Sequence, residues 1–219
     1  MHVETRQLIL VGSLLGWMCI GACGGSTTHI ESGRETLRNG DPNGPPTIQS
    51  LPDVARASAS PRVQSGLTLA RQILATRFPE PPADRSYRQL QSWIDEHVVP
   101  WVSARRDSVD ETRSEFGLEH GASEDERIVA TAVIGLLQED TALSLANIPA
   151  PAELDTEPEI GQMFRELVRT QTQPFQTAAL TEYRDCANRA YGQGQEQRRW
   201  ALFCHGRFDH LEAKLHASR

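Results

Sequence analysis

The C-terminal stretch from Cys204 to His216 holds the densest group of side chains that could do chemistry. Its thiol, imidazole and carboxylate groups belong to Cys204, His205, Asp209, His210, Glu212 and His216. His205 and Asp209 are four positions apart, so on a helix they share one face, a spacing that suits metal ligands. His210 follows Asp209 directly and points elsewhere. Two good ligands fall short of a metal site, and a solvated helix face explains the cluster better, so we predict no bound metal.

Motifs of well-known catalytic chemistry are absent from the sequence. It contains no G-x-S-x-G, H-E-x-x-H, P-loop or dinucleotide fingerprint, and Cys204-His205 lacks the C-x-x-C-H pattern of haem attachment. Neighbouring carboxylates occur at Asp95-Glu96 and Asp110-Glu111. Adjacent residues on a helix point in different directions, however, so these pairs are expected to be solvated. We therefore predict no catalytic residue, no cofactor and no enzymatic activity.

The elements that would position these residues are helices. Beyond Pro61 apolar residues recur at steps of three and four, and no stretch alternates as a strand would. The widest apolar stripe runs from Ile128 to Leu143, which predicts a central helix buried on more than one side. We expect an all-α domain over residues 61–219, either a helical bundle or a short array of helical hairpins. Trp93, Trp101 and Trp200 fall in apolar stripes and are expected in the core.

Capping residues, prolines and glycines predict where these helices begin and end. Helix starts are expected at Ser60-Pro61 and at two capping boxes, Ser123 with Glu126 and Thr156 with Glu159. Prolines within helical patterns predict a kink or a break at Pro100 and Pro174. Glycines predict helix ends at Gly117 and at the turn Gly192-Gln193-Gly194.

The N-terminus has the pattern of an export signal. Leu8–Ile20 is an apolar run too short to span a bilayer as a helix, and it has the length of a signal-peptide core. It ends in Ile20-Gly21-Ala22-Cys23, which resembles the lipobox of bacterial lipoproteins. The resemblance implies cleavage after Ala22, with residues 1–22 as signal peptide. It also implies diacylglycerol on the Cys23 thiol and an acyl chain such as palmitate on the new amine.

A linker is predicted between the anchor and the domain. Residues 23–60 comprise the lipidated N-terminus and a segment rich in Gly, Ser, Thr, Asn and Pro with few large apolar residues. Such a segment buries too little surface to offset its ordering entropy, so we expect a disordered tether. Gly24 and Gly25 follow the cysteine without an aspartate, and by the same resemblance this implies sorting to the outer membrane, facing the periplasm.

The remaining cysteines predict a disulfide. Cleavage removes Cys19 and the lipid occupies Cys23, so Cys186 and Cys204 are left as a pair in an oxidising compartment. They lie on consecutive expected helices on either side of the 192–194 turn. We predict a disulfide that joins the last two helices, the alternative being two free buried thiols.

The net charge of the chain and its predicted lipid anchor limit the classes of function that we expect. The net charge of −7 argues against nonspecific binding of nucleic acid, which needs a basic surface. We expect a non-enzymatic envelope lipoprotein that holds the membrane through its lipid and binds or scaffolds another envelope protein. The alternative is a periplasmic domain that binds a small molecule or a metal, through a cavity between helices or through the C-terminal histidines.

Overall fold

The computed structural model describes residues 46–52, 60–118 and 121–217. By its contacts the chain divides into two units, residues 1–36 and 37–219, and all described residues belong to the second. The expected signal peptide, Cys23 and most of the expected tether lie outside the described residues.

The described part of the chain is an all-α helical bundle. Its long helices are α1 (Pro61–Ala75), α3 (Val99–Glu115), α4 (Glu124–Ala146), α5 (Pro158–Ala190) and α6 (Gln195–Ala217). Shorter elements connect them: η3 (Ile48–Ser50), α2 (Tyr87–Trp93), η4 (Ile94–Val98) and η5 (Ala152–Thr156). Among the described residues no strand occurs. The sequence-based expectation of an all-α bundle is confirmed.

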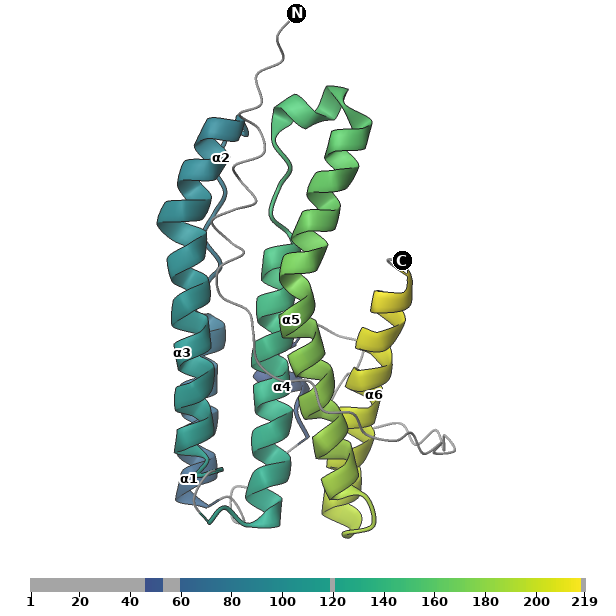
Figure 1. The fold of residues 1–219 in the computed structure, drawn as a ribbon. Coiled ribbons are helices and arrows are strands. Elements are labelled where there is room, and N and C mark those ends of the chain that lie inside the picture. The colour runs from purple at the N-terminus through teal and green to yellow at the C-terminus, as the bar shows by residue number, and fades with distance from the viewer. Residues whose placement is uncertain (1–45, 53–59, 119–120, 218–219) are drawn as a thin grey trace, which may run out of the picture. The chain divides into compact units, whose positions relative to one another are not determined.

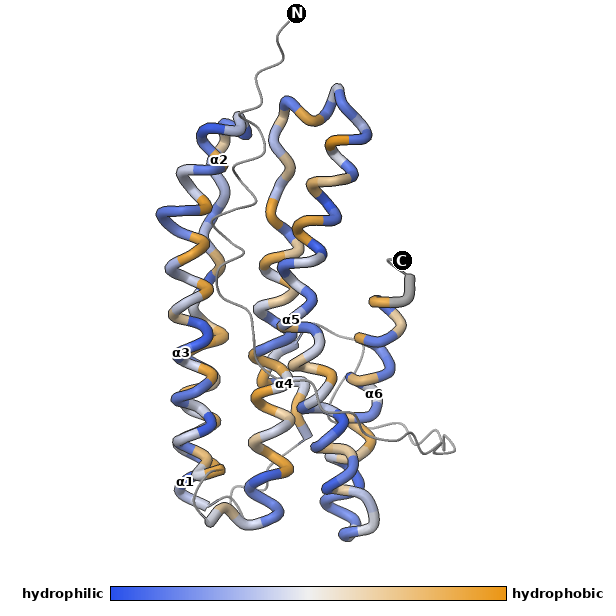
Figure 2. The backbone as a smooth tube through the Cα atoms, viewed as in Figure 1, coloured by the Kyte–Doolittle hydropathy of each residue, from blue (hydrophilic) through white to orange (hydrophobic). Residues whose placement is uncertain are grey.

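Helix α4 is the central helix, as its apolar stripe predicted. It passes between α1 and α3 on one side and α5 on the other (Figure 1). Hydrophobic residues recur along its length (Figure 2), and Ala132, Val133, Ile134, Leu136 and Leu137 are fully buried. Ser123 and Glu126 form the predicted capping box at its start. Its length and apolarity would suit a membrane span, but 78% of that window is buried inside the bundle, as in the core helix of a soluble protein.

Helix α5 begins differently from the sequence prediction. The predicted capping box of Thr156 and Glu159 is wrong, because the N-cap is Glu157 and it makes no side-chain capping bond. The hydroxyl of Thr156 donates instead to the carbonyl oxygen of Glu153, 3.1 Å away, within η5. Pro158 occupies the first helical position and makes the residue before it the cap, since proline suits that position.

Prolines inside two helical patterns leave the helices continuous. A π-helical turn, η4, precedes Pro100, and the amide of Val99 donates to the carbonyl oxygen of Ile94, five residues earlier. This wider turn relieves the clash between a proline ring and the preceding turn, so α2, η4 and α3 follow one another without a break. Helix α5 likewise passes through Pro174 as one element.

The folded part extends into the segment that the sequence assigned to the tether. Ile48–Ser50 form the short helix η3, and Leu51 is 6% exposed within the main core. Ile48 packs against the same core. Two apolar residues three positions apart, in a stretch otherwise polar, are enough to dock this turn beside α1. The expectation of a linker over the whole of 23–60 is corrected for residues 48–51.

The core consists of two apolar clusters. The larger contains most of α4 together with residues of α1, α3, α5 and α6. The smaller gathers around α2 and the C-terminal end of α4, and its members are Leu90, Trp93, Val98, Ala142, Leu145 and Phe175. Helix α4 contributes residues up to Leu137 to the first cluster and from Ala142 to the second. In the sequence of α4, the acidic pair Glu139-Asp140 lies between these two sets of apolar residues.

Candidate functional site

Glu139 is the centre of a buried network that joins α4, α5 and α6. Its side chain is 1% exposed and forms an ion pair with Arg207, which is completely buried. Arg207 Nε donates to Glu139 Oε2 over 3.1 Å, and the Tyr183 hydroxyl donates to the same oxygen over 2.8 Å. Burial, and next the charge of Glu139, raise the pKa of the Tyr183 phenol well above its ordinary value. The tyrosine therefore stays protonated and acts as a fixed donor.

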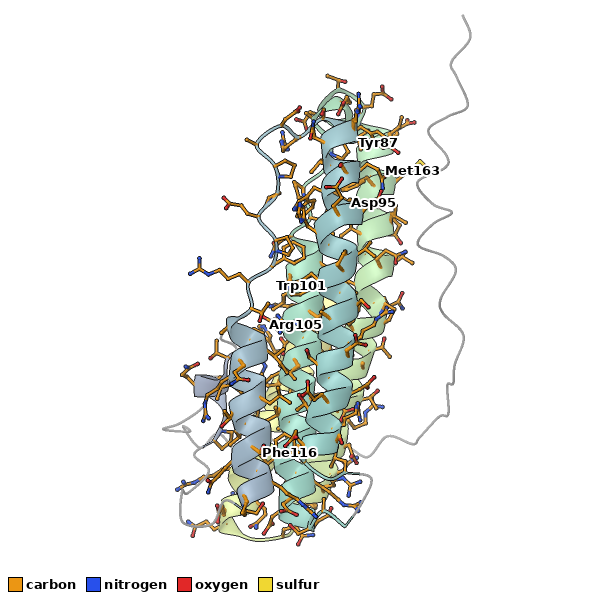
Figure 3. All side chains as sticks on the ribbon, turned by 90° about the vertical axis from the view of Figure 1, so that its left-hand side faces the viewer. Tyr87, Asp95, Trp101, Arg105, Phe116 and Met163 are labelled. Atoms are coloured by element: carbon orange, nitrogen blue, oxygen red, sulfur yellow. A yellow bond between two sulfur atoms is a disulfide. The ribbon has the colours of Figure 1, made fainter. Side chains whose placement is uncertain are left out.

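Arg105 of α3 ties three helices together beside this network. Its guanidinium donates to the carbonyl oxygen of Ile73 over 2.6 Å and to that of Thr76 over 3.2 Å, at the C-terminal end of α1. It also pairs with Asp140 of α4 at 3.0 Å. It lies over the ring of Trp101, one turn earlier on the same face of α3 (Figure 3). A cation here satisfies backbone carbonyls and the negative end of the α1 dipole, so this arginine has a structural role.

Cys186 and Cys204 form a disulfide between α5 and α6. Their Cα atoms are 6.0 Å apart, and both residues are fully buried. The predicted turn at Gly192-Gln193-Gly194 separates the two helices, and Gly192 has φ 77°. The bond closes a loop with a sequence separation of 18. In the chain-entropy description a loop of this length adds roughly 3 kcal/mol to the free energy of unfolding.

The C-terminal imidazoles and carboxylates are only partly brought together. His205 Nδ1 and Asp209 Oδ2 are 2.9 Å apart on the exposed face of α6, so the shared helical face is confirmed. In the described ranges, no group of three or more His, Cys, Asp or Glu side chains is arranged to hold a metal ion. Cys204 is bound in the disulfide and cannot serve as a ligand. The two side chains form a local hydrogen-bonded pair on a solvated face.

An arginine pocket opens among α3, α4 and α5. Its volume is about 410 Å³, and its lining residues are Arg113, Leu118, Arg127, Thr131, Thr181, Glu182, Arg184, Asp185, Asn188 and Arg189. Glu182 pairs with Arg113, and Asp185 accepts from Arg189 Nε over 2.8 Å. Burial raises the pKa of Glu182, and Arg113 opposes that shift. A volume of this size is within the range of small-molecule sites.

Exposed apolar side chains gather at the start of α5. Helix α5 has 33 residues and α6 has 23, so the N-terminal half of α5 continues past the end of α6 (Figure 1). Ile160 and Met163, one turn apart on this half, are 38% and 67% exposed. Met163 projects from the helix, and Tyr87, 38% exposed, begins α2 at the same end of the bundle (Figure 3). We call Ile160 and Met163, on the first turns of α5, the α5-end surface.

The buried charges and the arginine pocket are not among the sequence-predicted sites. The spacing of apolar residues along the helices gives a weak signal for the two buried arginines. Arg105 is four positions after Trp101 and four before Val109, and Arg207 is four positions before Leu211. Both arginines thus fall inside an apolar stripe. The three tryptophans expected in the core, Trp93, Trp101 and Trp200, are buried, which confirms that expectation.

Together, these features define an all-α domain cross-linked by the Cys186–Cys204 disulfide, with charged networks in its core and a basic pocket on its surface. Comparison of the chain with protein-family models, with curated proteins and with solved structures gives no match in any of the three. Function therefore has to be argued from the residues themselves.

Proposed function

We propose that the protein is a lipid-anchored lipoprotein of the bacterial cell envelope whose helical domain binds another envelope protein without catalysing a reaction. The observation that carries the proposal is the apolar run Leu8–Ile20, whose last residue begins the tetrad Ile20-Gly21-Ala22-Cys23. Several acyl chains on one cysteine would give durable anchoring, because each buried methylene contributes about 0.8 kcal/mol. The two glycines that follow Cys23 favour the outer membrane, on its periplasmic side.

The anchor is tested by exchanging the two N-terminal cysteines separately. We expect Cys23→Ser to abolish lipid attachment, because serine has no thiol to take the diacylglycerol, and to release the protein from the membrane fraction or leave it unprocessed. Cys19→Ser is the matched control, since Cys19 lies within the cleaved segment and should be processed as in the parent. Membrane fractionation and mass spectrometry of the mature N-terminus measure both effects. Processing and retention of Cys23→Ser equal to the parent would overturn the proposal.

The α5-end surface is the surface we propose for partner binding. Single exposed apolar residues are ordinary, but Ile160 and Met163 share one face of a helix half that α6 does not cover. Acidic side chains outnumber basic ones in the segment 153–169 that carries them: Glu153, Asp155, Glu157, Glu159 and Glu166 against Arg165 and Arg169. The chemistry that fits is an apolar segment of a protein flanked by basic residues, because opposite potentials orient such a contact. A tether to the membrane would raise the effective concentration of this surface toward envelope partners.

Site-specific photocrosslinking in intact cells tests this surface. A photoreactive residue in place of Met163 is expected to give one dominant crosslinked product, whose partner peptide is apolar and flanked by Lys or Arg. The same residue in place of the exposed Arg71 of α1 is the control and should give no such product. Equal products from both positions, or a product containing only a second copy of this chain, would contradict the proposal.

The second candidate function is binding of a small molecule between helices. The arginine pocket is the observation that favours it, because it combines a volume of about 410 Å³ with several polar side chains. The metal-binding form of this alternative finds less support, since in the described segments His205 and Asp209 form only an exposed pair.

A further inference from the structure

The arginine pocket is locally basic in a chain whose net charge is −7. Its lining includes four arginines, at 113, 127, 184 and 189, and two carboxylates, at 182 and 185. Four positive minus two negative charges leave an excess of two. Counting Glu124 of α4 as well, which accepts from Arg189 over 2.9 Å at the pocket's edge, still leaves an excess of one among the residues that the structure describes.

The two carboxylates of the pocket are already engaged by two of its arginines. Glu182 is bound by Arg113, and Asp185 is bound by Arg189. The first pair is close to neutral, and Arg189, which also binds Glu124, is more than balanced by its two carboxylates. The excess positive charge therefore belongs to the other two guanidinium groups, those of Arg127 and Arg184.

Arg127 and Arg184 are held in place by contacts that leave hydrogen-bond donors available. Arg127 Nε donates to the carbonyl oxygen of Ala122 over 3.1 Å, which fixes the plane of the guanidinium and uses only one of its five N–H groups. Arg184 lies over the ring of Phe208, 5.0 Å from its centroid. Stacking on a ring face uses no N–H group, so the edge of this guanidinium keeps its donors.

We propose that the arginine pocket binds a small organic anion through a phosphate or carboxylate group held by Arg127 and Arg184. A guanidinium offers paired donors that match the spacing of carboxylate and phosphate oxygens, and such charge-assisted bonds are stronger than neutral ones. Asn188 lines the same pocket and adds an amide that can donate to the ligand. Arg184 lies about 36 Å along α5 from Ile160, so this pocket is separate from the proposed partner surface.

Titration calorimetry on the full-length protein in detergent tests the pocket, with inorganic phosphate and succinate as probes at constant ionic strength. Saturable binding of at least one probe is expected. The probe with the lower dissociation constant shows whether the pocket prefers a phosphate or a carboxylate group. Arg127→Gln and Arg184→Gln should each weaken that binding at least tenfold, because each removes a charge-assisted pair. Arg71→Gln on α1 is the control for net charge and should change the dissociation constant less than twofold.

Two results would overturn the proposal. One is the absence of saturable heat with both probes up to tens of millimolar. The other is binding that Arg127→Gln and Arg184→Gln leave unchanged while each variant keeps the parent's helical circular dichroism and thermal midpoint. Because Cys23 and the α5-end surface play no part in this titration, its failure would not bear on the proposed anchor or partner.

Discussion

Arg207→Met is expected to lower the free energy of unfolding by about 3–5 kcal/mol, because it leaves the Glu139 carboxylate without its cation in a site that is 1% exposed. Methionine fills part of the volume of the arginine stem, so the loss reflects the uncompensated charge more than a cavity. Tyr183 would still donate to Glu139, but one neutral hydrogen bond does not balance a buried charge. Urea unfolding followed by circular dichroism measures the change.

The control for this prediction is Arg184→Met on α5. Arg184 is exposed and lies over Phe208, so its replacement should cost less than about 1 kcal/mol. The combined variant Glu139→Leu, Tyr183→Phe, Arg207→Met removes both charges and the hydroxyl, and it should recover most of the stability lost in Arg207→Met. A single variant Arg207→Met as stable as Arg184→Met would show that the buried pair does not contribute to the fold as described.

Local signals in the sequence predicted the helices well. The capping box at Ser123 is confirmed because its two hydrogen bonds involve residues three apart, and the pattern alone specifies them. The same kind of pattern failed at Thr156, where Pro158 decides the first helical position. The apolar stripe of Ile128–Leu143 identified α4 as central, because a helix that is apolar on most sides has to be buried.

The distant partners of the buried charged residues could not be predicted from local sequence patterns. Glu139 and Arg207 are 68 positions apart, and Arg105 acts on carbonyl groups of α1 that every helix end offers. A charged residue in an apolar stripe signals burial, but only the packing of three helices shows which partner compensates it. The arginine pocket combines residues from 113 to 189 for the same reason. The disulfide was an exception, since cysteine pairing leaves few alternatives.

The second large expected change in the free energy of unfolding concerns the contact between Gly66 of α1 and Phe116, which follows α3. Phe116 is completely buried, and a Cβ atom added at Gly66 would lie 2.5–2.7 Å from three of its ring carbons. The absence of a side chain at Gly66 therefore lets α1 approach the ring (Figure 3 labels Phe116). Phe116→Ala should lower the free energy of unfolding by about 3–5 kcal/mol through lost burial and a cavity. Gly66→Ala alone should lower it by about 1–3 kcal/mol through overpacking.

The double variant separates this close approach from general effects at the two positions. Once Phe116→Ala has removed the ring, Gly66→Ala no longer meets it, and alanine is favoured over glycine inside a helix by about 1 kcal/mol. Gly66→Ala should therefore change from destabilising to neutral or stabilising in the Phe116→Ala background, as measured by urea unfolding of all four proteins. Additive losses in that cycle would contradict direct packing of the ring on Gly66. The sign of the coupling thus reports whether α1 and the end of α3 meet through this glycine.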